Sequence, residues 1–167
     1  MAESLPVLTV GDIDAADIDS FLARFELMAE RVNHGQKITG SFWGEPEAGI
    51  VGQRVFFRDD TPVHSLLHEV CHIICMNDER RADLHRDAAS DDLEEAAVCY
   101  LQIILADFLQ GVGSTRLMQD MDTWGYSFRL GSTTRWFSED GADAFGWLVD
   151  NRLLDDSGRP LFRLREN

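Results

Sequence analysis

Residues 61–76 read TPVHSLLHEVCHIICM, and this stretch largely determines what kind of protein the chain forms. Its apolar residues recur at helical spacing, and Thr61-Pro62 is a typical helix start, with Thr61 as the N-cap and Pro62 at the first helical position. His68 and His72 are four residues apart, so on a helix they lie one turn apart on the same face. Because unpaired ionisable groups are costly to bury, two histidines and a glutamate in an apolar helix indicate a metal site.

His68, Glu69 and His72 together form an HExxH motif. In this motif the two imidazoles bind one divalent metal ion, and the glutamate takes a proton from a water molecule as general base. We therefore expect His68 and His72 to be metal ligands and Glu69 to be the catalytic residue. The competing interpretation is a hydrogen-bonded pair of histidines beside a solvated Glu69.

A catalytic zinc ion needs a third protein ligand in addition to a water molecule. No third histidine follows His72 in register, but residues 91–97 read DDLEEAA and place carboxylates at the start of the next helix. Glu94 falls on the apolar face of that helix and is expected to point toward the metal helix, so we predict it as the third ligand. A helix-capping role competes for Glu94, and Glu95 and His85 remain alternative ligands.

Other side chains near the motif allow more than one interpretation. His64, one turn before His68, makes a series of three histidines at i, i+4 and i+8, but it is expected to be a partly exposed first-turn residue, because a ring beyond the metal ligands often only orients other groups. Cys71 and Cys75 are expected to be small buried residues rather than ligands. The sequence does not choose among four residues that could polarise a substrate carbonyl: Tyr100, Tyr126, Arg80 and Arg81.

The remaining pattern predicts a mostly helical α+β fold with a small sheet, forming one domain over residues 1–167. We find no repeat, low-complexity segment or interdomain linker. The expected elements are a helix over 14–32, extended segments over 37–43 and 54–58, a polar stretch over 77–90 and a helix over 92–110. Three shorter helices between 114 and 152, capped by Ser114, Ser132 and Asp140, and a turn at 155–158 follow.

Composition narrows the class of partner. The chain has 15 Lys and Arg against 30 Asp and Glu, a formal net charge of −15. This excludes a nucleic-acid surface, which needs clustered basic residues. It fits an ordinary soluble protein, and it also fits a basic peptide or protein substrate. No apolar run is long enough to span a membrane, no signal-peptide pattern is seen, and three cysteines form no disulfide framework, so we expect a cytoplasmic protein.

Over residues 61–108 the chain resembles the zincin superfamily, specifically members whose third ligand is a glutamate on a following helix. The resemblance implies a metalloprotease-like fold in which His68, His72 and Glu94 bind zinc and Glu69 is the base.

A second resemblance is to the elongation factor P hydroxylase family, whose fold is related to metalloproteases. It is carried by Arg54-Val55-Phe56-Phe57, then by residues 67–72, and then by Arg80-Arg81 with Leu84. The third-acid segment and the C-terminal third do not match that family. This resemblance implies a shared fold and metal site.

The sequence therefore predicts a zinc-dependent hydrolase that acts on peptide or protein amide bonds. An iron-dependent protein hydroxylase is the alternative, because two histidines and one carboxylate also form the facial triad of non-haem iron oxygenases. A metal-binding module without catalysis is the third class considered. The ligand set does not distinguish Zn²⁺ from Fe²⁺.

Overall fold

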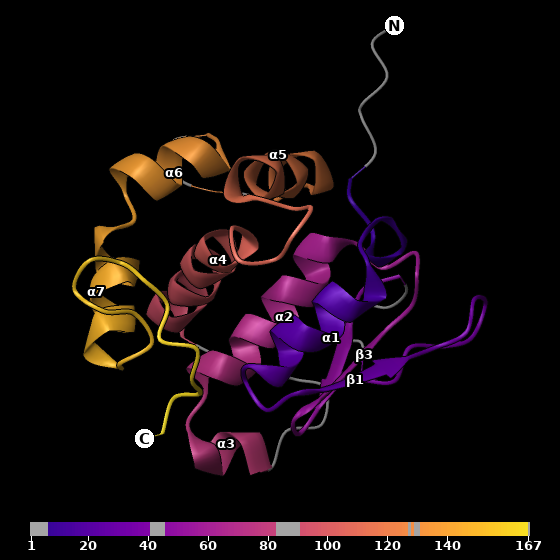
Figure 1. Cartoon of the computed structure of the whole chain (residues 1–167). Helices are drawn as coiled ribbons and strands as arrows, with labels where there is room; N and C mark the ends of the chain where they lie inside the picture. Colours follow the sequence, from indigo (N-terminus) through magenta and orange to yellow (C-terminus); the bar gives the residue numbers. More distant parts are fainter. Residues whose placement is uncertain (1–6, 41–45, 83–90, 127, 129–130, 167) are drawn as a thin grey trace, which may run out of the picture.

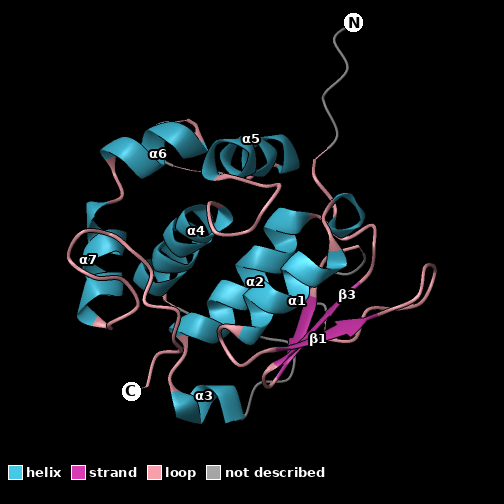
Figure 2. Cartoon of the chain, viewed as in Figure 1, coloured by secondary structure: helices cyan, strands magenta, loops and turns pink. Residues whose placement is uncertain are grey.

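The computed structural model describes residues 7–40, 46–82, 91–126, 128 and 131–166. Within them the chain has a mostly helical α+β fold with a three-stranded sheet, as the sequence predicts (Figures 1 and 2). After a short 3₁₀ turn at Val10–Asp12, the elements in order are α1 (Ala15–Ala23), β1 (Met28–Arg31), β2 (Gly49–Val51), β3 (Arg54–Phe57), α2 (Val63–Cys75), α3 (Asp78–Ala82), α4 (Asp92–Ala106), α5 (Ser114–Trp124), α6 (Thr133–Glu139) and α7 (Ala142–Asp150).

The sheet has the strand order β1-β3-β2, so β3 is the central strand. β1 runs parallel to β3, with Ala29 opposite Val55, and β2 runs antiparallel to it, with Ile50 opposite Val55. Gly52 joins β2 to β3 with a φ of +59°, a backbone conformation that glycine adopts without steric cost. The result is a small sheet whose central strand leads directly into the metal-motif helix.

Helix α2 is the most buried helix of the fold. Every residue of it except His68 is buried, and it packs against β2 and β3 on one side and against α4 on another. Figure 1 shows α2 between the sheet and α4, with α5 and α6 across one end of the molecule and α3 at the other. The motif therefore sits in the interior, where polar side chains require partners.

The helix begins one residue later than expected. Pro62 takes the extended N-cap conformation and Val63 is the first helical residue, while the Thr61 hydroxyl accepts a hydrogen bond from the Arg58 amide at 2.9 Å. The other predicted helices are present, but α4 ends at Ala106 and not near residue 110, and α5 and α7 follow the N-cap residues Gly113 and Gly141.

The first helix is much shorter than the sequence predicts. It ends in a Schellman motif: the Leu27 amide bonds to the Leu22 carbonyl at 3.1 Å, and the Glu26 amide to the Ala23 carbonyl at 3.0 Å. Glu26 occupies the left-handed position, with a φ of +59°, where glycine is usual. The chain then forms β1, in which Met28 is 59% exposed, so its helical spacing was misleading.

Two other expectations differ from the structure. Residues 37–40 are not a strand and 41–43 lie outside the described residues, whereas the unpredicted strand β2 forms at 49–51. The polar stretch after residue 76 contains the short helix α3. No helix among the described residues is both long enough and apolar enough to cross a membrane.

We predict that Glu26→Gly stabilises the protein. The glutamate is exposed and held in a left-handed conformation, which costs roughly 1–2 kcal/mol for a residue with a Cβ, and part of that gain is offset by the greater freedom of glycine in the unfolded chain. Urea unfolding should show a net gain of about 0.5–1 kcal/mol. Ser20→Gly, inside α1, is the matched control and should destabilise the protein.

Candidate metal centre

Three potential ligand atoms converge where α2 faces α4. His68 Nε2 lies 3.2 Å from His72 Nε2 and 3.1 Å from Glu95 Oε1, and His72 Nε2 lies 3.3 Å from Glu95 Oε2. Tetrahedral zinc with ligands about 2.0–2.1 Å long has ligand–ligand distances of roughly 3.3 Å. The three groups are therefore close enough to share one metal ion, and two imidazoles with one carboxylate suit zinc or ferrous iron.

A buried amide fixes which nitrogen of His68 is available. Gln102 Nε2 donates to the His64 carbonyl at 3.1 Å, so its Oε1 is the acceptor that faces His68 Nδ1 at 2.7 Å. Because Nδ1 must then carry a hydrogen, Nε2 is left with a lone pair directed at His72 and Glu95. Such an outer hydrogen bond is the usual way a protein sets the tautomer of a metal-binding histidine.

The two histidines respond differently to their surroundings. Burial acts to lower the pKa of His68, but Tyr126, Cys99 and Glu95 outweigh it and hold that pKa well above the ordinary value. Burial, followed by the charge of His68, lowers the pKa of His72 to about 4. The cluster thus favours one positive charge among its three groups, which is the property expected of a cation site.

The structure places Glu94 differently from the sequence expectation. Glu94 is buried and points inward as predicted, but its carboxylate meets Arg80 Nη1 at 2.7 and 3.0 Å and not the two histidines. Glu95 instead lies on the α4 face that also carries Gln102, and that face is the one turned toward His68. The sequence signal that favours Glu95 is this glutamine, a polar residue two turns later on an apolar helix. His85, the other alternative ligand, lies outside the described residues.

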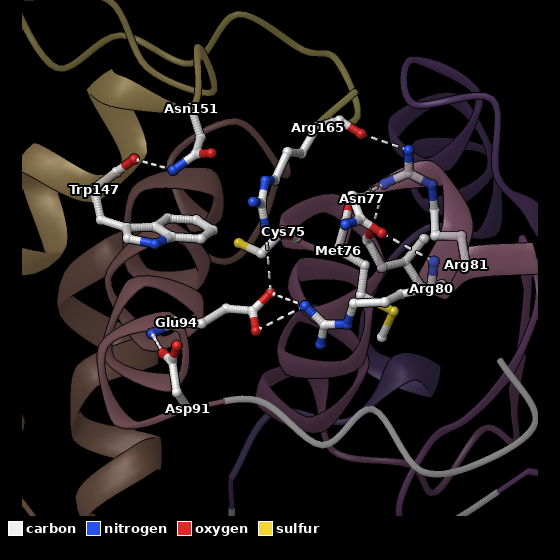
Figure 3. A network of polar contacts seen from close by, with 11 residues as sticks. Cys75, Met76, Asn77, Arg80, Arg81, Asp91, Glu94, Trp147, Asn151 and Arg165 are labelled. Atoms are coloured by element: carbon white, nitrogen blue, oxygen red, sulfur yellow. Dashed lines mark hydrogen bonds and ion pairs between the residues drawn. The ribbon is translucent and has the colours of Figure 1, made fainter. Parts of the chain in front are cut away.

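Figure 3 shows the network that Glu94 does form. Its backbone amide donates to the side chain of the N-cap residue Asp91 at 2.7 Å, which is half of the capping box considered from the sequence, but the Glu94 carboxylate is engaged by Arg80. Its carboxylate lies against Arg80 of α3 and 3.9 Å from Arg165 near the C-terminus. Glu94 therefore ties the start of α4 to two other segments, next to the residue that completes the cluster.

The same region satisfies the last carbonyls of α2, which have no partners inside the helix. Arg81 Nη1 donates to the carbonyls of Ile73, at 3.1 Å, and Met76. The Arg165 amide donates to Ile74 at 2.9 Å, and its guanidinium donates to Cys75 at 3.1 Å. Positive charge at a helix C-terminus is also favourable for the helix dipole. The turn that carries His72 is thereby fixed from outside the helix.

Glu69 lies beside the cluster and shares a pocket with it. The residue is 7% exposed, and burial, with Glu47 and Glu95 adding to it against the opposing charge of His68, raises the pKa of its carboxyl to about 7. The pocket has a volume of about 1150 Å³ and is lined by His68, Glu69 and Glu95 together with an aromatic wall of Trp124, Tyr126, Phe128 and Trp136. A molecule in this pocket would contact both the cluster and the candidate base.

Tyr126 is the one of the four proposed carbonyl-polarising residues that lines this pocket. Its hydroxyl lies 3.2 Å from His64 Nδ1, and burial raises its pKa to about 12, so it remains a hydrogen-bond donor. Tyr100 instead stacks on Phe137, and both arginines belong to the network around α3.

His64 is not partly exposed as expected but 1% exposed, and burial lowers its pKa to about 3, so it is neutral. Its Nδ1 contacts the Tyr126 hydroxyl, and it is not a member of the ligand cluster. Cys71 and Cys75 are fully buried free thiols, as predicted, and burial raises the pKa of each.

None of the protein-family models, curated proteins or solved structures with which the chain was compared matches it significantly. The likeness to zincins and to elongation factor P hydroxylases therefore stays a prediction from motifs. What the structure defines is an α+β protein with a cluster of two histidines and one glutamate at the edge of an aromatic pocket.

We predict that Glu95→Gln weakens zinc binding far more than Glu94→Gln does. Glu95→Gln removes the charged oxygens that face both histidines. Even substitution of a residue that only hydrogen-bonds to a metal ligand costs roughly 10–100-fold in metal affinity, so loss of a ligand should cost at least as much. Glu94→Gln should chiefly reduce the free energy of unfolding, by about 1–3 kcal/mol, because it weakens a bond between charged groups. Competition titration with a chromogenic chelator measures the first effect and urea unfolding the second. Loss of zinc binding only in Glu94→Gln would restore Glu94 as the ligand.

We also predict that Gln102→Leu lowers zinc affinity about 10–100-fold although residue 102 does not touch the metal. Without the acceptor at Nδ1, His68 is free to adopt the tautomer whose hydrogen points into the cluster. The same chelator titration measures this, and proton NMR of the imidazoles reports the tautomer. Unchanged affinity with a folded variant would show that Gln102 is only a packing residue.

Proposed function

We propose that the protein is a metal-dependent hydrolase that cleaves amide bonds of a peptide or protein, with His68, His72 and Glu95 as zinc ligands and Glu69 as the base. The observation that carries the proposal is the shared pocket: the carboxyl of Glu69 and two members of the ligand cluster, His68 and Glu95, line one cavity that is large enough for part of a peptide. The proposal replaces Glu94 by Glu95 in the ligand set that the sequence favoured, because Glu95 is the residue that meets both histidines.

The number of ligands supports a catalytic site in preference to a structural one. Structural zinc is usually enclosed by four protein ligands, often cysteines, whereas catalytic zinc keeps one position for water or substrate. The described cluster has three members, none of them a cysteine, and its Glu95 side chain is 45% exposed on the pocket side. A zinc ion held there would lower the pKa of water and polarise a substrate carbonyl.

The chain's own residues then supply the proton transfers. Glu69 takes a proton from the attacking water and delivers it to the nitrogen of the leaving amine. The Tyr126 hydroxyl, held by His64, is the donor available on the opposite wall for the carbonyl oxygen. Gln102 keeps His68 in the tautomer that binds metal throughout.

An iron-dependent hydroxylase is the second candidate, and the ligand set is the observation that favours it. Two histidines and one carboxylate with open positions are the facial triad of non-haem iron oxygenases. That chemistry gives no role to a base beside the metal, whereas here a buried glutamate lines the same cavity. For this reason we place hydrolysis first. We further propose a cytoplasmic location, in line with three free, buried cysteines.

Glu69→Gln separates the two candidates. The change keeps the size of the side chain and removes its basicity, so a hydrolase should lose about 10²- to 10⁴-fold in turnover while zinc stays bound. The assay is cleavage of a mixed library of basic peptides, followed by mass spectrometry, with chelator titration to confirm the metal content. Glu79→Gln, on the neighbouring short helix α3, is the control and should leave turnover unchanged. Hydrolysis that survives Glu69→Gln contradicts the mechanism, and oxygen consumption dependent on ferrous iron would support the hydroxylase.

A further inference from the structure

The described residues that line the pocket beside the metal cluster give it a strongly acidic character. Four carboxylates line it, namely Glu47, Glu69, Asp92 and Glu95, and among the described lining residues there is no lysine or arginine. A bound divalent metal would offset the negative charges of two of these carboxylates, its ligand Glu95 and the neighbouring base Glu69. Glu47 and Asp92 would still face the cavity as anions, so a substrate group entering it meets negative potential.

Glu47 and Trp124 form a defined pair on the wall of this pocket. Trp124 Nε1 donates to Glu47 Oε1 at 2.7 Å, across 77 residues of sequence, from the end of α5 to the segment before β2. The indole is nevertheless 42% exposed, so one part of an aromatic surface is fixed in place and open to solvent. Within the described part of the chain no basic side chain pairs with Glu47, and its second oxygen has acceptor capacity left.

The aromatic wall continues from this pair along the cavity. The rings of Tyr126 and Phe128 are stacked with centroids 6.3 Å apart, and those of Phe128 and Trp136 with centroids 4.7 Å apart. Aromatic faces attract ammonium and guanidinium groups, and they also accept the methylene stem of a long basic side chain. A neutral apolar group would use the wall but would place no positive charge beside Glu47 and Asp92.

We propose that the pocket recognises a lysine or arginine side chain of the substrate, with its methylene stem along the aromatic wall and its cationic head against the second oxygen of Glu47 and the face of the Trp124 ring. As a statement about the substrate this inference rests on the proposed hydrolase function. The binding site itself is independent of the metal, because neither Glu47 nor Trp124 is a member of the ligand cluster. The net charge of −15 acts in the same direction by attracting cations at long range.

The test compares two small probes that differ in one charged group: N-acetyl-lysine methylamide and N-acetyl-norleucine methylamide. Each is titrated into the full chain, with and without zinc, and the indole N–H signal of Trp124 is followed by NMR. The lysine probe should bind about tenfold or more tightly than the norleucine probe, in both metal states, and its advantage should shrink as salt is added.

Variants locate the interaction. Glu47→Gln should weaken binding of the lysine probe about 5- to 10-fold and leave the norleucine probe unchanged. Trp124→Leu, followed through the signals of the remaining aromatic residues, should weaken both probes. Glu139→Gln is the matched control, because Glu139 is an acid on α6 that pairs with Arg135 and does not line the pocket.

Equal affinity for the two probes, no measurable binding of the lysine probe, or equal loss in Glu47→Gln and Glu139→Gln would each overturn the inference. The result is separate from the proposed function. Lysine-selective binding in a protein that cleaves no peptide retains the cation pocket and removes the hydrolase, whereas peptide cleavage without preference for basic residues does the reverse.

Discussion

Three groups with lone pairs approach one another on two packed helices: His68 Nε2 and His72 Nε2 are 3.2 Å apart, and they lie 3.1 and 3.3 Å from the two carboxylate oxygens of Glu95. Such an arrangement is repulsive unless a cation lies among the three groups, whether a shared proton or a metal ion. Much of the surrounding structure supports this arrangement. Gln102 fixes the tautomer of one histidine, α4 supplies the carboxylate, and the rigidity of α2 sets the spacing between the two rings.

The rigidity of α2 has its own physical cause. A helix that is apolar on most sides is held by burial between the sheet and α4, where each fully buried side chain contributes roughly 1.5–3 kcal/mol. Burial alone would leave the carbonyls at its end unsatisfied, and two arginines from different parts of the chain fulfil that need. The polar motif is therefore carried by a helix that is fixed along its sides and at its end.

The sequence predicts those features that depend on local pattern. The fold class, the metal-motif helix, the start of α4 at Asp91 and that of α6 at Ser132, and the convergence of His68 and His72 all follow from spacing and capping residues. The end of α1 does not, because Glu26 takes a conformation for which only glycine gives a signal. The choice between Glu94 and Glu95 does not either. Both lie near the α2–α4 interface, and which of them faces the histidines depends on where Arg80 lies. The position of Arg80 is set by tertiary structure, so sequence periodicity does not predict it.

The arginine contacts at the end of α2 also bear on local unfolding. Residues 163–166 are separated by about 90 positions from the carbonyls that Arg165 caps, and they connect to α3 through the bond from the Asp78 amide to the Glu166 carbonyl. If this segment detaches, the final turn of α2 loses the two hydrogen bonds from Arg165 and keeps those from Arg81, so we expect a local opening there to involve His72. A cation bound in the cluster favours only the closed form, and occupancy of the cluster and attachment of the terminal segment are thus linked equilibria. Slower amide exchange near residue 165 would then report an event at His72, on another element.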